Sequence, residues 1–393
     1  MPFLLAKRCT YKYLMNSKDK LGYYLVGWKK IYNKTLALIE SAKVGYEPLW
    51  IFNDSVYSSI DWTIPISESL ESIYARRAKQ LREQYDYLVL YYSGGSDSHN
   101  ILHTFLKNNL FIDEIVMQIP ELDRKNLNGW DTSGRNVYGE IVAVATPQLQ
   151  YLKGILNPNT KIRYQDISKP ALDLLEKDDW FERHPVGNLI SITGGVARQA
   201  VNIYDEGILS LSYAGKRACQ IVGVDKPLVY FDGADYYAFF ADNSAQHCSP
   251  VELNRDYYEI FHNHFVTEFF YWTPDMPEIV VKQAQEIKTA CELDPAKKLL
   301  WTQTFDKHIG EYRSVMHPII YPGVGTPSFQ TEKPPATIIR EMDSWFWETA
   351  SSNAKNNYLQ VMQYLKDNIN PKHGIKQDLF NGISSTNSKF YKL

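Results

Sequence analysis

A short run of small and polar residues, Ser93-Gly94-Gly95-Ser96-Asp97-Ser98, holds the side chains whose types and spacing best suit chemistry in this sequence. Glycines let backbone amides approach an anion closely, and the three serine hydroxyls add further hydrogen-bond donors. The run therefore predicts a phosphate-binding turn, with the Asp97 carboxylate beside it.

The residues on either side of this turn predict a strand before it and a helix after it. Residues 87–92 are aromatic or aliphatic without alternation, as expected of a strand covered on both faces in a parallel sheet. Apolar residues recur at helical spacing over 101–106, and Asn108-Asn109 can end the helix in a left-handed conformation. The start of that helix would add its positive dipole end to the anion site.

The six residues fit the signature SGGxDS, and the run resembles that of the N-type ATP pyrophosphatases, or PP-loop enzymes, among them asparagine synthetase and GMP synthetase. The resemblance implies ATP and Mg²⁺ as ligands and cleavage of ATP between the α and β phosphates. It assigns the pyrophosphate portion to Ser93, Gly94, Gly95, Ser96, Asp97 and Ser98, and the metal to Asp97. No GxxxxGK[ST] run occurs, so the turn does not indicate γ-phosphate transfer. The alternatives are an ordinary glycine-rich turn and a loop that binds nucleotide without chemistry.

Two further predicted strands would bring residues to the same edge of the sheet. In related enzymes the exit of the second strand lines the adenine pocket, which assigns that role to Met117 and Gln118 at the end of residues 114–119. Residues 219–224 lead into Asp225 and Lys226, and Gly-Val-Asp-Lys-Pro resembles the Gly-Ile-Arg element of phosphoadenylylsulfate reductases. Ligands of open α/β sheets bind at the carboxyl ends of strands. Asp225 and Lys226 are therefore predicted to face the phosphates, with a surface turn fixed by proline as the alternative.

Two other glycine motifs invite a phosphate interpretation that their context disfavours. Gly194-Gly195 lies within helical apolar spacing, so close helix packing is favoured over a second phosphate loop. Asp232-Gly233-Ala234-Asp235 resembles the GxGADE element of asparagine synthetase, but Tyr236 stands where that element has a glutamate. Because Asp-Gly is flanked by alternating apolar residues, a hairpin over 228–242 is the favoured prediction.

The predicted fold is α/β and has three parts. Residues 1–62 form a small N-terminal α+β extension, residues 63–250 the parallel-sheet PP-loop domain, and residues 251–393 a helical C-terminal domain. Ser67 is predicted to cap the helix that precedes the central strand. Helical spacing from Leu253 through Phe269 predicts a helix after the boundary, and Asp343 is predicted to cap a last helix that extends through Leu365.

Composition narrows the class of protein. The chain has 393 residues, of which 44% are hydrophobic, enough for a sizeable core. A formal net charge of −3 gives no electrostatic case for duplex nucleic acid. The N-terminal residues lack the features of a signal peptide, and no run of about 18 apolar residues occurs. These features predict a cytoplasmic protein without a membrane segment.

The resemblance to PP-loop enzymes implies an ATP-dependent ligase that adenylates an acceptor and lets a nitrogen nucleophile displace AMP. The acceptor, a small molecule or a nucleobase, is not specified, and ammonia would come from solution or from a separate subunit, because residues 1–62 are too few for a glutaminase domain. Association into a homo-oligomer is left open. The alternative function is a non-catalytic adenine-nucleotide-binding module. A sulfurtransferase is disfavoured because the four cysteines contain no CxxC pair.

Overall fold

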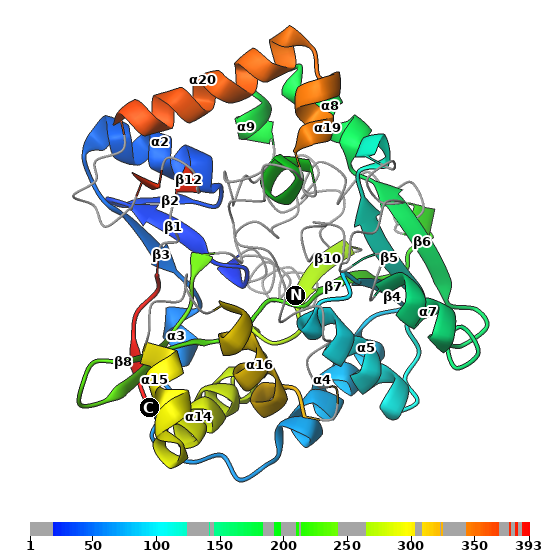
Figure 1. Cartoon of the computed structure of the whole chain (residues 1–393), viewed down its shortest axis with the longest axis vertical. Coiled ribbons are helices and arrows are strands. Elements are labelled where there is room, and N and C mark those ends of the chain that lie inside the picture. The colour runs from blue at the N-terminus through cyan, green and yellow to red at the C-terminus, as the bar shows by residue number, and fades with distance from the viewer. Residues whose placement is uncertain are drawn as a thin grey trace, which may run out of the picture.

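The structure, a computed structural model, describes residues 19–123, 141, 145–183, 192–197, 210–211, 214–242, 265–302, 309–322, 324, 343–368, 377–378, 382–383 and 387–393 of the chain. A five-stranded sheet, in which every neighbouring pair is parallel, runs from the middle of the molecule to its right side in Figure 1. Its strands are β4 (Tyr87–Tyr91), β5 (Glu114–Ile119), β6 (Lys161–Asp166), β7 (Ala218–Val222) and β10 (Phe265–Phe269). The fold is thus α/β, as the sequence predicts.

The order of the strands in this sheet is β10-β7-β4-β5-β6. When the five strands are counted in the order in which they occur along the chain, the first strand, β4, lies beside the fourth, β7. Later strands are added in opposite directions on the two sides of this point, as in a doubly wound sheet. The reversal lies between β4 and β7, where Leu90 pairs with Ile221. Leu88, Val89 and Leu90 are fully buried, which confirms the prediction that the uninterrupted apolar run is a strand covered on both faces.

Helices α4 (Leu70–Gln84), α5 (Ser96–Lys107) and α14 (Glu278–Leu293) pack with the sheet in one core, and α14 contacts α15 (Pro295–Thr302) and α16 (Ile309–Ile320). The N-cap of α4 is Ser69, whose hydroxyl accepts a hydrogen bond from the Ser72 amide at 3.2 Å. The prediction of Ser67 as the cap is therefore wrong by two residues. The apolar stripe of α4 faces the core as predicted, with Ile73 and Leu81 fully buried.

The N-terminal part forms a separate antiparallel sheet of β1 (Tyr23–Val26), β2 (Lys29–Ile31) and β3 (Pro48–Ile51), accompanied by α2 (Lys34–Val44) and α3 (Asp54–Tyr57). A third sheet contains the predicted hairpin, β8 (Leu228–Phe231) and β9 (Tyr236–Phe239), with β13 (Tyr391–Lys392) beside β9. In the hairpin turn, Asp232 Oδ1 accepts hydrogen bonds from the Ala234 and Asp235 amides, both at 2.8 Å. The hairpin prediction is confirmed, and the Asp232 carboxylate stabilises the turn.

The region after residue 250 differs from the prediction. Phe265–Phe269 is not the end of a helix but strand β10, which pairs with β7 in parallel. The segment contains two phenylalanines and the β-branched Val266 and Thr267, all of which favour strands, and its pairing with β7 outweighs the helical spacing of the preceding residues. The three-part division of the chain stays a prediction, but the sheet takes its fifth strand from beyond residue 250.

The predicted last helix is two helices, α19 (Ser344–Thr349) and α20 (Ser352–Asn368), because the chain is extended at Ala350. Asp343 precedes α19, but its carboxylate accepts hydrogen bonds from the amides of Ile192 and Thr193, both at 2.8 Å. These amides begin η3 (Ile192–Ala197), a helical turn, as predicted around Gly194-Gly195. The remaining short elements are η1 (Glu121–Asp123), α7 (Thr146–Leu152), α8 (Ser168–Leu175), α9 (Trp180–Arg183), β11 (Gln377–Asp378) and β12 (Gly382–Ile383).

The main hydrophobic core joins all three predicted parts of the chain, since it contains Trp50, Leu88 and Tyr391. A second core contains residues of α8, α9, η3, α19 and α20 together with Leu38 of α2. Figure 1 shows α20 crossing above α2 and α9 at one end of the molecule. None of the helices in the described part of the chain is long and apolar enough to cross a membrane.

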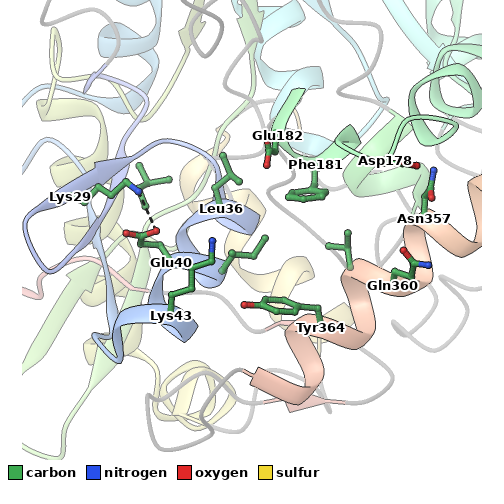
Figure 2. Close-up of a pocket in the computed structure, with 13 residues that line it drawn as sticks. Lys29, Leu36, Glu40, Lys43, Asp178, Phe181, Glu182, Asn357, Gln360 and Tyr364 are labelled. Atoms are coloured by element: carbon green, nitrogen blue, oxygen red, sulfur yellow. Dashed lines mark ion pairs between the residues drawn. The ribbon is translucent and has the colours of Figure 1, made fainter.

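Helices α2 and α20, far apart in sequence, bound a cavity of about 520 Å³ (Figure 2). Its apolar lining includes Leu36, Phe181 and Val361, and the Lys29–Glu40 ion pair at 3.1 Å lies on its wall. No residue of the glycine-rich run lines this cavity. It is therefore distinct from the site that the sequence predicts.

Candidate functional site

The glycine-rich run lies at the point where the sheet reverses its strand order. Strand β4 ends at Tyr91 and α5 begins at Ser96, while β7 ends at Val222 and leads into Asp225 and Lys226. Because β4 and β7 are adjacent and parallel, both exits lie at the carboxyl edge of the sheet. This is the edge at which open α/β sheets bind their ligands.

The turn has a shape that requires glycine. Gly94 has φ +80°, a left-handed backbone conformation that residues other than glycine adopt only at a cost in free energy. Gly95 is the N-cap of α5 and forms no side-chain cap hydrogen bond. The first turn of α5 therefore presents backbone N–H groups at the sheet edge, as an anion site needs.

Two of the serines hold the turn together. Ser93 Oγ accepts from the Gly95 amide at 3.1 Å, and Ser98 Oγ accepts from the Ser93 amide at 3.3 Å. Ser98 Oγ also donates to the Gly95 carbonyl at 3.1 Å. Ser93 is exposed and Ser98 is buried. Ser93 thus both shapes the turn and faces solvent, while Ser98 acts chiefly on the backbone of the turn.

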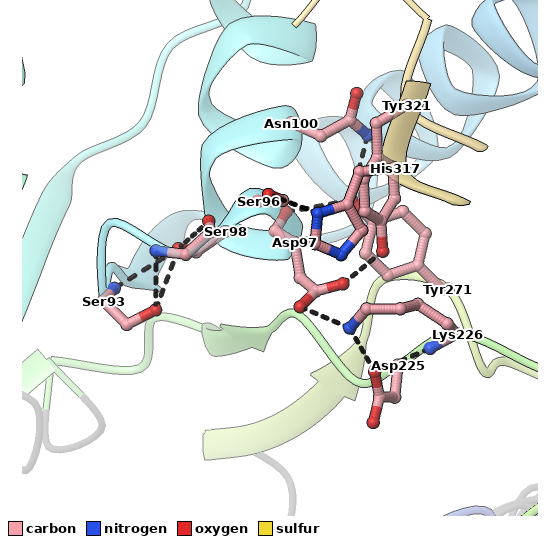
Figure 3. Close-up of polar contacts among 11 residues, drawn as sticks. Ser93, Ser96, Asp97, Ser98, Asn100, Asp225, Lys226, Tyr271, His317 and Tyr321 are labelled. Carbon is pink, nitrogen blue, oxygen red and sulfur yellow. Dashed lines mark hydrogen bonds and ion pairs between the residues drawn. The ribbon is translucent and has the colours of Figure 1, made fainter. Parts of the chain in front are cut away.

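An ion pair joins the two strand exits. Lys226 Nζ lies 2.8 Å from Asp97 Oδ2 and 2.8 Å from Asp225 Oδ1 (Figure 3). The Lys226 side chain is only 19% exposed. Burial alone would lower the pKa of Lys226, but the carboxylates of Asp225 and Asp97 outweigh it and raise that pKa above its ordinary value. Lys226 therefore stays a cation at neutral pH, between the two carboxylates.

Close backbone packing brings these groups together. A Cβ atom added to Gly223, just after β7, would lie 3.2 Å from Asp97 Cβ and 3.3 Å from the Ser98 amide nitrogen. The exit of β7 can therefore pass this close to the first turn of α5 because residue 223 has no side chain.

Three further residues contact the turn that sequence reasoning did not single out. His317 Nδ1 lies 2.9 Å from Ser96 Oγ, and the Tyr321 hydroxyl donates to Asp97 Oδ1. The Tyr271 hydroxyl donates to the Asp97 carbonyl at 2.9 Å. These partners are 174 to 224 residues away in sequence, so no local pattern could have indicated them. Tyr271 lies two residues after the end of β10. There the chain continues alongside the exit of β7, because the Trp272 N–H donates to the Val224 carbonyl at 3.2 Å.

The hydroxyls that face Asp97 remain protonated donors. Burial raises the pKa of Tyr321, and the negative charge of Asp97 raises it further. Burial, the neighbouring Tyr74 and Asp97 raise the pKa of Tyr271 in the same way. Ser96, which is 1% exposed, directs its hydroxyl to His317, so its side chain serves the packing of the turn.

The predicted adenine-binding residues lie at the same edge, one strand further along. The Tyr92 amide donates to the Val116 carbonyl at 2.9 Å, which brings the start of the turn beside the end of β5. The Met117 side chain is fully buried in the main core, and the side-chain Nε2 of Gln118 donates to Gln165 Oε1 at 3.3 Å. The backbone of this strand end, rather than the Met117 side chain, is thus suited to contact a ligand.

The donor set suits a metal that arrives with phosphates. Within the part of the chain that the structure describes, no group of three or more His, Cys, Asp or Glu side chains gathers into a metal site. Asp97 and Asp225 nevertheless both lie 2.8 Å from the same ammonium group. Two carboxylate ligands suit Mg²⁺ when phosphate oxygens and water fill the rest of its coordination shell, because Mg²⁺ rarely takes all its ligands from the protein.

The described cysteines are unsuited to sulfur transfer. Cys219 lies within β7 and Cys291 within α14, and both are buried. Burial raises the pKa of both thiols, that of Cys291 to about 11, so neither is an available thiolate near neutral pH. Cys9 and Cys248 lie outside the described residues.

No protein-family model and no curated protein matches this chain. The resemblance to PP-loop enzymes therefore depends on the SGGxDS run and on the residues that follow β7.

Proposed function

We propose that this protein is an ATP-dependent ligase of the PP-loop type, which cleaves ATP between the α and β phosphates and adenylates an acceptor. A nitrogen nucleophile would then displace AMP. The observation that carries this proposal is the contact of Lys226 with Asp97 at 2.8 Å, where a glycine turn meets the exit of the neighbouring strand. A cation, a metal-binding carboxylate and helix N–H groups thereby converge on one anion site.

The available donors of Lys226 support a role with pyrophosphate. An ammonium group has three N–H donors, and two of them point to Asp97 and Asp225. Among the described residues the third has no partner. Lys226 can therefore donate to a phosphate oxygen and still keep both carboxylates. Its charge would stabilise the negative charge that develops on departing pyrophosphate.

Asp97 and Asp225 would hold Mg²⁺, which neutralises phosphate charge and orients the phosphates for in-line displacement. The amides of the turn and the first turn of α5 would bind the pyrophosphate portion, and the backbone at Met117 and Gln118 would contact adenine. No covalent protein nucleophile is needed, because positioning and charge neutralisation account for the chemistry.

The acceptor class is a small molecule or a nucleobase. Ammonia from solution or from a separate subunit would supply the nitrogen, in a cytoplasmic setting. The proposal is tested by incubating the full chain with Mg²⁺, an ammonium salt and ATP labelled in the α phosphate, across a panel of carboxylate and nucleobase acceptors, with pyrophosphate and orthophosphate measured by coupled enzyme assays. AMP and pyrophosphate are the expected products. ADP and orthophosphate, with no AMP under any acceptor condition, would overturn it.

A second candidate, a nucleotide-binding module without catalysis, is favoured by one observation. Both carboxylate oxygens of Asp97 already accept hydrogen bonds, one from Lys226 and the other from Tyr321. Such a carboxylate could stabilise the turn without ever binding a metal. Tight ATP binding that is independent of Mg²⁺ and yields no pyrophosphate would support this function over the first.

A further inference from the structure

The C-terminal end of α16 contacts the first turn of α5 through two side chains. His317 and Tyr321 are one helical turn apart, and the Tyr321 amide donates to the His317 carbonyl at 2.7 Å. They contact the consecutive residues Ser96 and Asp97. His317 is 1% exposed and Tyr321 is fully buried, so both contacts are made by side chains buried on the α16 side.

We propose that Tyr321 and His317 are positioning residues for the metal and phosphate site. Tyr321 holds the Asp97 carboxylate in the orientation that binds Mg²⁺, and His317 holds the backbone of the turn through Ser96. This inference rests on the proposed function for its ligand. It concerns residues outside the SGGxDS run and outside the segment after β7 that carries Lys226.

The chemistry of a carboxylate permits this role. Each carboxylate oxygen can accept two hydrogen bonds or bind a metal beside one of them. Asp97 Oδ1 therefore retains a lone pair for Mg²⁺ while Tyr321 remains bound. Hydrogen-bond partners of a ligating group fix its orientation, and their loss typically lowers metal affinity about 10–100-fold.

The end of α16 is itself held firmly. The Tyr74 hydroxyl of α4 donates to the Ile320 carbonyl at 2.6 Å and accepts from the Gln283 side chain of α14 at 2.8 Å. Tyr321 therefore reaches Asp97 from a helix that is fixed to two others. Because Tyr321 is already held in place, it loses little conformational freedom when it orients the Asp97 carboxylate, as precise positioning requires.

The first test uses Tyr321→Phe, with Tyr85→Phe as the matched control. Tyr85 is another buried tyrosine that donates to a carboxylate, Glu268 Oε1 at 2.7 Å, and it does not contact the glycine turn. ATP binding is measured by calorimetry at increasing Mg²⁺ and again in EDTA. Tyr321→Phe should need about tenfold or more Mg²⁺ for half-maximal binding, with ATP affinity in EDTA unchanged. The control should match the wild type, and an unaltered Mg²⁺ requirement in Tyr321→Phe would overturn the assignment.

The second test measures the protection of the turn's backbone amides in the absence of nucleotide. Hydrogen–deuterium exchange of peptides covering residues 93–101 should be faster in His317→Ala than in the wild type. His317→Asn, whose amide can occupy the place of Nδ1, should restore slow exchange. Equal exchange in all three proteins would overturn the role of His317. If this pattern holds but the wild type forms no pyrophosphate, the proposed function fails and the positioning of the turn stands.

Discussion

Asp97 Oδ2 and Lys226 Nζ lie 2.8 Å apart although 129 residues separate them in sequence. The pair connects the first turn of α5 to the exit of β7, and Asp225 extends it to a triad with one cation and two anions. Two carboxylates around one ammonium leave a net negative charge. That charge favours a divalent cation at the site, which in turn favours phosphates.

Removal of the Asp97 charge should separate catalysis from stability. Asp97→Asn is expected to lose Mg²⁺-dependent pyrophosphate formation, because an amide is a poor ligand for Mg²⁺ in this position. Its unfolding free energy should change by only about 1 kcal/mol, since the ion pair is partly solvated and Lys226 keeps Asp225. A pyrophosphate assay measures the activity of the variant, and urea unfolding measures its unfolding free energy. Asp113→Asn, which breaks the Arg82 pair away from the turn, should show the opposite pattern.

Loss of the Lys226 charge should slow the chemical step more than it weakens binding. Lys226→Met is expected to lower the rate of pyrophosphate formation by about 10²–10³-fold, the usual effect of removing one group that stabilises transition-state charge. The dissociation constant for ATP should rise far less. Single-turnover kinetics separate the two quantities. An equal loss in binding and in rate would show that Lys226 acts on the ground state alone.

A methyl group at residue 223 should disturb the site without unfolding the protein. Gly223→Ala places a Cβ 3.2 Å from Asp97 Cβ, so the first turn of α5 must move by a few tenths of an ångström. Misplacement of reacting groups by about 1 Å can cost about 10²-fold in rate, so a loss up to that size is expected. Gly154→Ala is the control, because nothing lies within 4 Å of its added Cβ. Wild-type pyrophosphate formation in Gly223→Ala would contradict the close-packing argument.

His99 should make stability depend on pH. Burial, with a smaller contribution from His103, lowers the pKa of His99 to about 4, and its Nδ1 lies 2.7 Å from the Tyr92 hydroxyl. The unfolded chain, with a histidine pKa of about 6.5, binds the proton more readily than the folded one. Stability is therefore lost as pH falls from about 6.5 towards 4. Urea midpoints across this range should fall less steeply for His99→Gln than for the wild type, and identical slopes would contradict the assignment.

Local signals explain what the sequence predicts well. The strand, turn and helix around residues 87–107 depend on an apolar run, a left-handed glycine and helical spacing, all of which act over a few residues. The Asp232-Gly233 hairpin forms for the same reason. Lys226 was identified because Gly-Val-Asp-Lys-Pro resembles the Gly-Ile-Arg element of phosphoadenylylsulfate reductases, and because ligands of open α/β sheets bind at the carboxyl ends of strands.

The missed features depend on partners that are distant in sequence. Strand β10 is only five residues long and becomes a strand through its pairing with β7. Arg77 lies among the buried residues of α4, and its charge is accommodated there because Glu268 of β10 binds it at 2.8 Å. Tyr321 and His317 show no local motif at all. Their roles follow from how α16 packs against α4 and α5.

The long-range origin of the Asp97 contacts has a consequence during translation. A nascent chain that has emerged from the ribosome through α7 already contains the whole SGGxDS run. It lacks Lys226, Tyr271 and Tyr321, the side chains that hold Asp97 in the folded protein. Because β7 and β10 are also synthesised later, β4 has an open edge until they arrive. Truncated products should therefore carry the signature without a formed site, and nucleotide binding should be acquired only late in synthesis.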